Sequence, residues 1–355
     1  MQASPRRTGP VLVTGAAGFI GYHVARRLLG DGVPVVGLDC LTPYYDVGLK
    51  RARLERLRAF PNATLLDTDL ADAAATERVF ARYRPHRVVH LAAQPGVRRA
   101  LTEPHPYLSA NVTGFLNVLE GCRHHGVAHL VYASSSSVYG ANRHLPFSEH
   151  AGADHPVSLY AATKRANELM AHSYAHLFGV PATGLRFFTV YGPWGRPDMA
   201  VYTFTDAIAR GAPITVADGG RVLRDFTYID DVVESLVRIL DLPPRPDPDW
   251  AARAPDPATA AAPYRIYNIG GDAPHALNDL IRLIEDALGR RAERRDGERP
   301  PGDVAETRAD TADLARAVGF VPAVPLAEGV RRFVAWYRAY HRLPAAAAPA
   351  AALAV

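Results

Sequence analysis

The chain has 355 residues, of which 40 are Lys or Arg and 36 are Asp or Glu, giving a formal net charge of +4. The hydrophobic share of 48% is ordinary for a globular protein and excludes global disorder. The near balance of charges argues against nucleic-acid binding as the main activity, and the length predicts one large domain or two lobes.

The first half of the chain alternates short apolar runs with segments of helical periodicity. This alternation is typical of βαβ units, and it predicts an α/β fold with a Rossmann-type, doubly wound parallel sheet. After residue 192 the elements become shorter and mixed, which predicts a smaller mixed α/β lobe. Strands are expected at 11–14, 34–39, 64–66, 87–91, 130–133 and 180–185, and helices at 19–29, 49–60, 73–83, 113–125 and 160–177.

The same pattern predicts where the chain divides. We expect a first domain at 9–190 and a second lobe at 191–340, with about 225–240 and 264–270 returning to the first domain. Two segments rich in Pro and Ala carry no periodicity. They predict a surface loop at 242–263 and a disordered tail at 344–355.

No run of about 18 apolar residues is present, so we expect no transmembrane helix and no membrane partner. The N-terminal segment MQASPRRTGP lacks an apolar leader, which predicts a cytoplasmic protein. Cys40 and Cys122 do not form a CxxC pair, so we expect reduced thiols rather than a zinc or dithiol site. His124, His125 and His129 lack chelating geometry with any acid, and no metal site is expected.

A glycine-rich turn separates the first predicted strand from the first predicted helix. Gly15, Gly18 and Gly21 form a GxxGxxG pattern, in which glycines permit a tight turn and a close approach of the backbone to a pyrophosphate. Asp39 ends the second predicted strand, where a carboxylate binds adenosine ribose hydroxyls and repels a 2′-phosphate. The pattern predicts NAD, against the alternative of a structural turn with a capping aspartate. The residues placed to meet the adenine are Asp69 and Leu70.

Tyr160 and Lys164 lie four residues apart at the start of a predicted helix, and therefore on one helical face. A nearby lysine and a positively charged nicotinamide favour the phenolate of a tyrosine, which is otherwise a poor base at neutral pH. Ser134–Ser137 ends the fifth predicted strand, at the edge where α/β sheets place their chemistry. A Tyr–Lys pair alone is common on helix surfaces, so this prediction depends on the other two motifs.

Together these motifs resemble the extended short-chain dehydrogenase/reductase family from about Gly9 to Tyr337 and, within it, the UDP-glucuronate 4-epimerases. The segments that carry the likeness are GLDCLTPYYDVGLKRARL, LAAQPGVR, YASSSSVYG, SLYAATKRANELMAHSY, TGLRFFTVYGPWGRPDM and RDFTYIDD. The resemblance implies that Tyr160 is the general acid and base, with Lys164 and Ser135 completing the triad. Beside the cofactor it places Phe19, Ile20, Leu91, Ala92, Ala93, Gln94, Asn111 and Phe187.

For the substrate, the resemblance implies a UDP-sugar whose C6 carboxylate is held by Ser136, Ser137 and Thr189. The other substrate positions that it implies are Arg98, Ser135, Arg196, Thr215, Val216, Arg224 and Asp303. The chain departs from the family pattern at three positions, which are Cys40, Pro95 and Pro300. The last of these falls where a glutamine usually precedes PGD, close to the expected diphosphate contacts.

Relatives of this kind oxidise C4 to a 4-keto sugar, and neighbouring acids and bases decide the fate of that intermediate. The 4,6-dehydratases carry an Asp-Glu pair, and UDP-glucuronate decarboxylases a Glu, where this chain has Ser136 and Ser137. The resemblance therefore favours C4 epimerisation of UDP-glucuronate to UDP-galacturonate. A UDP-glucose/UDP-galactose 4-epimerase, a UDP-glucuronate decarboxylase and a non-catalytic NAD-binding protein remain as alternatives. The family also implies a homodimer, in which 113–125 and 158–177 pair with their copies as a four-helix bundle.

Overall fold

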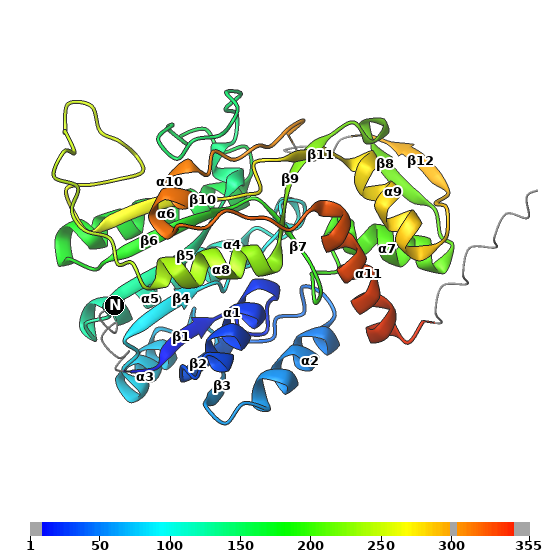
Figure 1. Ribbon diagram of the computed structural model, residues 1–355. Helices are drawn as coiled ribbons and strands as arrows, with labels where there is room; N and C mark the ends of the chain where they lie inside the picture. The colour runs from blue at the N-terminus through cyan, green and yellow to red at the C-terminus, as the bar shows by residue number, and fades with distance from the viewer. Residues whose placement is uncertain (1–8, 299–303, 344–355) are drawn as a thin grey trace, which may run out of the picture.

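The computed structural model describes residues 9–298 and 304–343 of the chain. Its largest feature is a seven-stranded parallel sheet with the strand order β10-β6-β5-β4-β1-β2-β3 (Figure 1). The order runs outward from β1 in both directions, so a switch point lies between β1 and β4 and the predicted Rossmann-type fold is confirmed. The strands are β1 (Val11–Thr14), β2 (Val35–Asp39), β3 (Ala63–Asp67), β4 (Arg87–His90), β5 (His129–Ser135), β6 (Ala182–Phe187) and β10 (Tyr264–Ile269).

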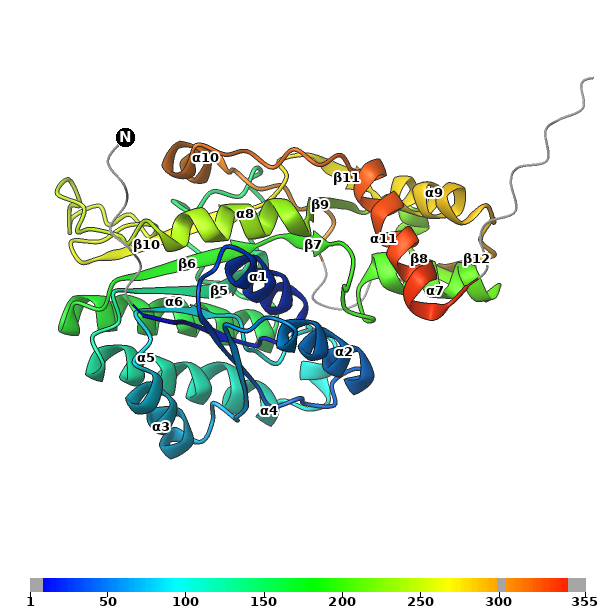
Figure 2. The ribbon, with the colours of Figure 1, turned by 60° about the horizontal axis from the view of Figure 1, so that its bottom comes forward.

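Helices cover both faces of this sheet (Figure 2). Buried side chains of α1, α2 and α8 share an apolar core with the smaller lobe, whereas those of α3, α5 and α6 form a second core on the opposite face. Because both faces are covered, central strands such as β1 read as continuous apolar runs. The helices are α1 (Phe19–Gly30), α2 (Val47–Arg58), α3 (Ala73–Tyr83), α5 (Gly114–His124), α6 (Leu159–Phe178) and α8 (Ile229–Leu240).

Some elements begin elsewhere than the sequence predicted. The helix expected at 49–60 begins at Val47, because the carboxylate of Asp46 accepts a hydrogen bond from the Gly48 amide and caps the helix. The helix expected from residue 113 is preceded by the short α4 (His105–Tyr107) and by a π-helical turn at Leu108–Thr113. The spacing of apolar residues does not reveal a π-helical turn, because such a turn differs from an α-helix in its backbone hydrogen bonds and not in its composition.

The remaining elements form the smaller lobe and the segments beside it. Strand β9 pairs in parallel with β7 and antiparallel with β11, while β8 pairs with β12, so this part is mixed α/β as predicted. Strand β10 then extends the large sheet beside β6. The predicted limits of the two domains stay a prediction. The elements are β7 (Thr189–Tyr191), α7 (Ala200–Arg210), β8 (Ile214–Ala217), β9 (Leu223–Tyr228), β11 (Pro274–Ala276), α9 (Leu277–Leu288), β12 (Arg294–Gly297), α10 (Ala312–Val318) and α11 (Leu326–His341).

The segment at 242–263 contains no helix and only an isolated bridge between Thr259 and Arg265. It is not wholly superficial, because Ala258, Ala260 and Ala262 are buried against the second core. Both cysteines are free. Among the described residues, none of the helices has the length and apolar character of a membrane span. The tail at 344–355 lies outside the described residues.

Candidate active site

The glycine-rich turn between β1 and α1 lies directly against the loop that follows β4. Gly15 has a φ of +70°, and a Cβ there would come within 2.8 Å of the Ala92 nitrogen. A Cβ on Gly21 would collide with the Gly15 carbonyl oxygen, so neither position accepts a side chain. The helix begins after Gly18 without a capping side chain, and its first N–H groups and positive dipole end remain for an anion. This cradle fits the pyrophosphate of a dinucleotide.

Asp39 ends β2 with both carboxylate oxygens on backbone amides. Oδ2 accepts a hydrogen bond from Ala17 N at 3.0 Å and Oδ1 accepts one from Leu41 N at 2.9 Å. The aspartate therefore fixes the glycine-rich turn and the loop after β2 together, and each oxygen keeps a lone pair for ribose hydroxyls. Asp69 is exposed and its Oδ1 accepts from Ala71 N at 2.9 Å, while Leu70 is buried.

The loop after β4 is held by residues from three elements. The Thr14 hydroxyl accepts hydrogen bonds from the amides of Leu91 and Ala92, both at 3.2 Å. Asn111, in the π-helical turn, accepts from the Gln94 amide at 2.7 Å and donates to the Gln94 carbonyl at 3.1 Å. Its amide also donates to Thr163 Oγ1 at 3.0 Å, which joins the loop to α6. The predicted cofactor residues that are at least half-buried around this turn and loop are Phe19, Ile20, Leu91, Ala92, Ala93 and Phe187.

Tyr160 and Lys164 come from the first turns of α6, which Ser158 caps by accepting from the Ala161 amide. Lys164 is buried and its Nζ donates to the Ala133 carbonyl of β5 at 2.9 Å. Burial lowers the pKa of Lys164 to about 8. Burial raises the pKa of the half-buried Tyr160, while the positive charge of Arg196 and a hydrogen bond with Ser135 act against that rise.

Replacing Lys164 with Met is expected to stabilise the cofactor-free protein by about 2 kcal/mol at pH 7, because it removes the desolvation of a buried ammonium. The folded pKa lies below that of an unfolded lysine, so the cost is complete below pH 8 and disappears as the pH rises through the unfolded value. Urea unfolding at pH 7 and at pH 10.5 measures both effects. Equal stability of the two proteins at pH 7 would show that Lys164 carries no such cost.

Ser135, Ser136 and Ser137, at the end of β5, form a compact turn and not a row of equivalent groups. Ser135 Oγ accepts from the Ser137 amide at 3.2 Å and from the Ser137 hydroxyl at 2.9 Å. Ser136 and Ser137 lie in a single 3₁₀ turn at Ser136–Tyr139, and both are half-buried. Strand β6 extends two residues beyond the predicted strand, so that Phe187 pairs with Ser135 at the carboxyl edge.

Ser134 has a different role, because its hydroxyl donates to Glu168 Oε1 at 2.6 Å inside the fold. Glu168 also forms a buried pair with Arg186, and neither residue stood out in the sequence. Arg186 was visible as the one charge in the strand β6, whereas Glu168 lies among other charged residues of α6 and nothing in the spacing marks it.

Arg196 follows β7, which begins at the half-buried Thr189. Its Nε and Nη2 lie 2.9 and 2.6 Å from the two carboxylate oxygens of Asp198. Burial opposes the charge of Arg196, but this bidentate pair raises its pKa. Tyr44 donates to Asp198 Oδ2 at 3.3 Å from the loop after β2, so the pair joins the two lobes. Sequence reasoning missed Tyr44 and Asp198, although both lie in segments that carry the family likeness.

Arg53 is a second link between the lobes that the sequence did not indicate. It lies in α2, within a strongly charged stretch, but it is fully buried. Its guanidinium donates to the Ala17 carbonyl of the glycine-rich turn at 2.7 Å and to the Trp194 carbonyl at 2.6 Å. The cofactor turn and the loop carrying Arg196 are therefore fixed by one side chain.

The other predicted substrate residues belong to other segments of the chain. Arg98 is exposed at the start of a 3₁₀ turn. On β8, Thr215 is exposed and Val216 is buried, and on β9 the Arg224 guanidinium donates to the Leu223 carbonyl at 2.8 Å. Pro300 and Asp303 lie outside the described residues. In the described part of the chain no cluster of His, Cys, Asp and Glu could hold a metal ion.

A phosphate-sized glycine cradle, a carboxylate after β2 and a Tyr–Lys pair at the carboxyl edge define a dinucleotide-binding α/β enzyme class. The model of the NAD dependent epimerase/dehydratase family matches residues 11–270. The chain therefore belongs to this family, which confirms the family resemblance read from the sequence.

Named relatives resemble the chain over almost its whole length. A protein of Rhizobium meliloti (strain 1021) named "probable UDP-glucuronate 4-epimerase" is 49% identical over 335 residues, which are 93% of this chain and 97% of that protein. The crystal structure of UDP-glucuronic acid 4-epimerase from Bacillus cereus, in complex with UDP-glucuronic acid and NAD, is 30% identical with a TM-score of 0.83, covering 93% and 99% of the two chains. That of a UDP-glucose 4-epimerase with UDP-glucose, from Thermotoga maritima, is 29% identical with a TM-score of 0.81, covering 94% and 99%.

Proposed function

We propose that the protein is an NAD-dependent UDP-glucuronate 4-epimerase, which interconverts UDP-glucuronate and UDP-galacturonate. The observation that carries the proposal is the Tyr160–Lys164 pair beside a turn of three serines that contains hydroxyl groups and no carboxylate. The relatives named as UDP-glucuronate 4-epimerases support the same substrate.

Tyr160 takes the proton from the C4 hydroxyl of the sugar and returns it after the sugar has turned over. Bound NAD supplies the hydride acceptor and donor for C4. Lys164, whose ammonium donates to the Ala133 carbonyl, would also hold the ribose hydroxyls of the cofactor, and its charge favours the phenolate of Tyr160. Ser135 binds the oxygen that Tyr160 deprotonates. These four groups invert C4 without net oxidation.

The serine turn controls a side reaction that a 4-keto uronate makes available. Such a compound is a β-keto acid, and it loses CO₂ when the C5–C6 bond aligns with the π system of the ketone. Hydroxyl groups of Ser136, Ser137 and Thr189 hold the carboxylate out of that alignment and still let the ring turn. Arg196 provides a cation for the diphosphate or the C6 carboxylate of the substrate. Before the substrate binds, the carboxylate of Asp198 holds the Arg196 guanidinium.

A UDP-glucose 4-epimerase is the second candidate, because the structural likeness to the Thermotoga maritima enzyme is nearly as strong. NMR of the purified protein, incubated separately with UDP-glucuronate and UDP-glucose and without added NAD, separates the two. Formation of UDP-galacturonate supports the proposal and a retained cofactor. Turnover of UDP-glucose alone would overturn the roles given to Ser136, Ser137 and Thr189.

We also propose a homodimer built as a four-helix bundle from α5 and α6 of each subunit. These helices cover one face of the sheet and expose large apolar side chains, among them Leu116, Leu169 and Leu177, of which Leu177 is 67% exposed. Exposed apolar surface on adjacent helices favours association with a second copy. A cytoplasmic location accords with the two free thiols.

Leu169→Glu is expected to convert the dimer to a monomer, since it places a charge in the apolar interface. Sedimentation velocity at micromolar concentration measures the mass. Leu242→Glu is the control, because Leu242 is similarly exposed but lies in the loop after α8. A monomeric wild-type protein would contradict the proposed dimer.

A further inference from the structure

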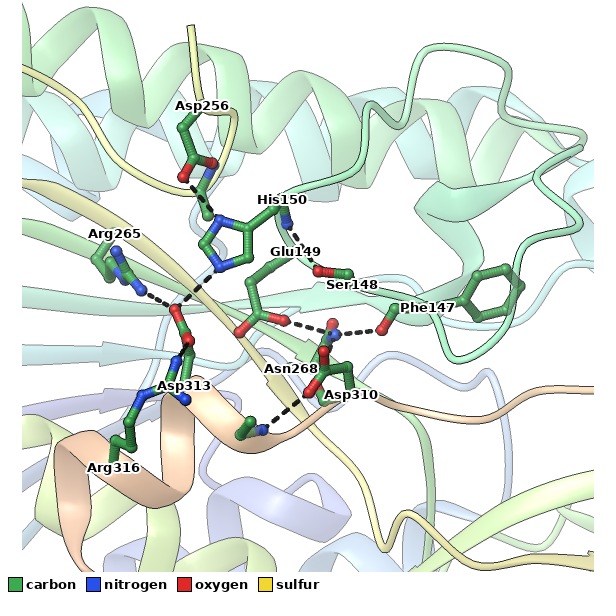
Figure 3. Close-up of polar contacts among 12 residues, drawn as sticks. Phe147, Ser148, Glu149, His150, Asp256, Arg265, Asn268, Asp310, Asp313 and Arg316 are labelled. Carbon is green, nitrogen blue, oxygen red and sulfur yellow. Dashed lines mark hydrogen bonds and ion pairs between the residues drawn. The ribbon is translucent and has the colours of Figure 1, made fainter. Parts of the chain in front are cut away.

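The loop between the serine turn and α6 carries a buried carboxylate that has no role in the proposed mechanism. Glu149 is only 1% exposed. Its Oε2 accepts a hydrogen bond from Asn268 Nδ2 at 3.0 Å, and its Oε1 has no hydrogen-bond partner among the described residues (Figure 3). A buried carboxylate with a free oxygen is costly, which calls for a reason to keep it.

Asn268, on β10, connects this carboxylate to the serine turn. Its Oδ1 accepts a hydrogen bond from the Tyr139 hydroxyl at 2.6 Å. Its Nδ2 lies within hydrogen-bond distance of three acceptors, which are Glu149 Oε2 and the carbonyls of Phe147 and Asp310, at 3.0, 2.9 and 3.0 Å. An amide group has two hydrogens, so the acceptors compete and a charged carboxylate takes the larger share.

Tyr139 is the last residue of the 3₁₀ turn that contains Ser136 and Ser137. Its ring stacks on Phe147 with centroids 4.6 Å apart and planes at 5°. Two hydrogen bonds therefore separate Glu149 from the residue that ends the serine turn. Ionising Glu149 polarises the Asn268 amide, which strengthens its bond to the Tyr139 hydroxyl.

The charges around Glu149 come from four segments. His150, its neighbour, lies 2.7 Å from Asp256 and 3.1 Å from Asp313, between the loop after α8 and α10 (Figure 3). Burial raises the pKa of Glu149 to about 7, and Asp313 and Asp310 also raise it, while its own backbone amide and His150 lower it. The cations that pair with Asp313 are Arg265 of β10 and Arg316 of α10.

We propose that Glu149 is a positioning residue, which acts through Asn268 and Tyr139 to hold the serine turn against the C6 carboxylate of the sugar. The inference rests on the proposed function. When the turn loosens, the C5–C6 bond of the 4-keto sugar breaks and C6 leaves as CO₂. Its electron pair forms a C4–C5 enolate, which takes a proton at C5 to give a UDP-4-keto-pentose. The hydride removed from C4 is then not returned, so the nicotinamide cofactor remains reduced.

The ratio of UDP-4-keto-pentose to UDP-galacturonate, followed by NMR of the full-length protein with UDP-glucuronate and NAD from pH 5.5 to 8.5, tests the proposal. In the wild type this ratio is expected to rise as the pH falls through about 7, because Glu149 takes up a proton. In Glu149→Gln the group stays neutral. We expect a ratio about fivefold above wild type at pH 8, with no step near pH 7.

Tyr139→Phe removes the hydroxyl and keeps the ring stack on Phe147, so it serves as a second route to the same change. It is expected to raise the ratio at pH 8 as Glu149→Gln does, and the double variant is expected to raise the ratio no further.

Glu149→Gln is also expected to raise the melting temperature at pH 8. The pKa of Glu149 is higher in the folded than in the unfolded protein, so the wild type loses stability as the pH rises from about 4.5 to 7.

A folded Glu149→Gln protein with the wild-type ratio across the pH range would overturn the proposal, and so would additive effects of the two substitutions. A wild type that forms no product from UDP-glucuronate overturns the proposed function, and this inference with it.

Discussion

Tyr160→Phe is expected to lower kcat by about 10³-fold and to leave the cofactor bound, because only the group that moves the C4 proton is lost. The remaining ring keeps its edge-to-face contact with Tyr107, whose centroid lies 6.4 Å away. Conversion of UDP-glucuronate, followed by NMR, measures the activity. The absorbance of NAD released on denaturation measures cofactor content.

Tyr83→Phe provides the control, since Tyr83 lies at the end of α3 and takes no part in the site described above. Its activity should equal that of the wild type. Retention of more than about a tenth of the activity in Tyr160→Phe would move the general acid and base to another group. Because the phenolate is the active base, the rate of the wild type should rise as the pH approaches the pKa of Tyr160. Burial raises this pKa, whereas Arg196 and Ser135 lower it.

The cofactor cradle could be predicted from the sequence because all its parts are local. Gly15 and Gly21 lie within one strand–turn–helix unit, and Asp39 ends the next strand. In such a unit the alternation of elements places the turn and the carboxylate at the same edge of the sheet. The Tyr160–Lys164 pair is local too, since helical geometry alone puts both on one face.

The contacts that hold the site could not be predicted, because they join residues far apart in the chain. Tyr139 and Asn268 are 129 positions apart, and they meet only because β10 joins the edge of the large sheet beside β6. Arg53 was hidden for a different reason. In a charged helix such as α2 an arginine is ordinarily solvated, and nothing in the spacing shows that the carbonyls of Ala17 and Trp194 surround this one.

The structure also changes how the arginine of the substrate site is understood. The resemblance implied that Arg196 binds the substrate, and the structure shows its guanidinium in a bidentate pair with Asp198. A substrate anion must therefore compete with a carboxylate two residues away. Tyr44, which donates to the same carboxylate, would stabilise Asp198 after such an exchange.

Arg186→Met is expected to lower the free energy of unfolding by about 3 kcal/mol, because it leaves the buried carboxylate of Glu168 with Arg165, which is only partly buried, as its remaining cation. Both side chains are fully buried, with Nε and Nη2 of Arg186 2.8 and 2.9 Å from the two oxygens of Glu168. Burial alone would raise the pKa of Glu168, but Arg186, the Ser134 hydroxyl and Arg165 hold it below its ordinary value. Urea unfolding at pH 7 measures the loss.

The double variant Glu168→Leu/Arg186→Met separates the cost of a stranded charge from the loss of packing. It removes both charges, so it should recover most of the stability that the single variant loses. The pH dependence gives an independent check. In the wild type the depressed pKa of Glu168 means that stability is lost as the pH falls below the ordinary carboxyl range. In Arg186→Met the pKa of Glu168 should rise above its wild-type value, so less stability should be lost in acid than in the wild type. A double variant less stable than the single one would show that the pair itself stabilises the fold.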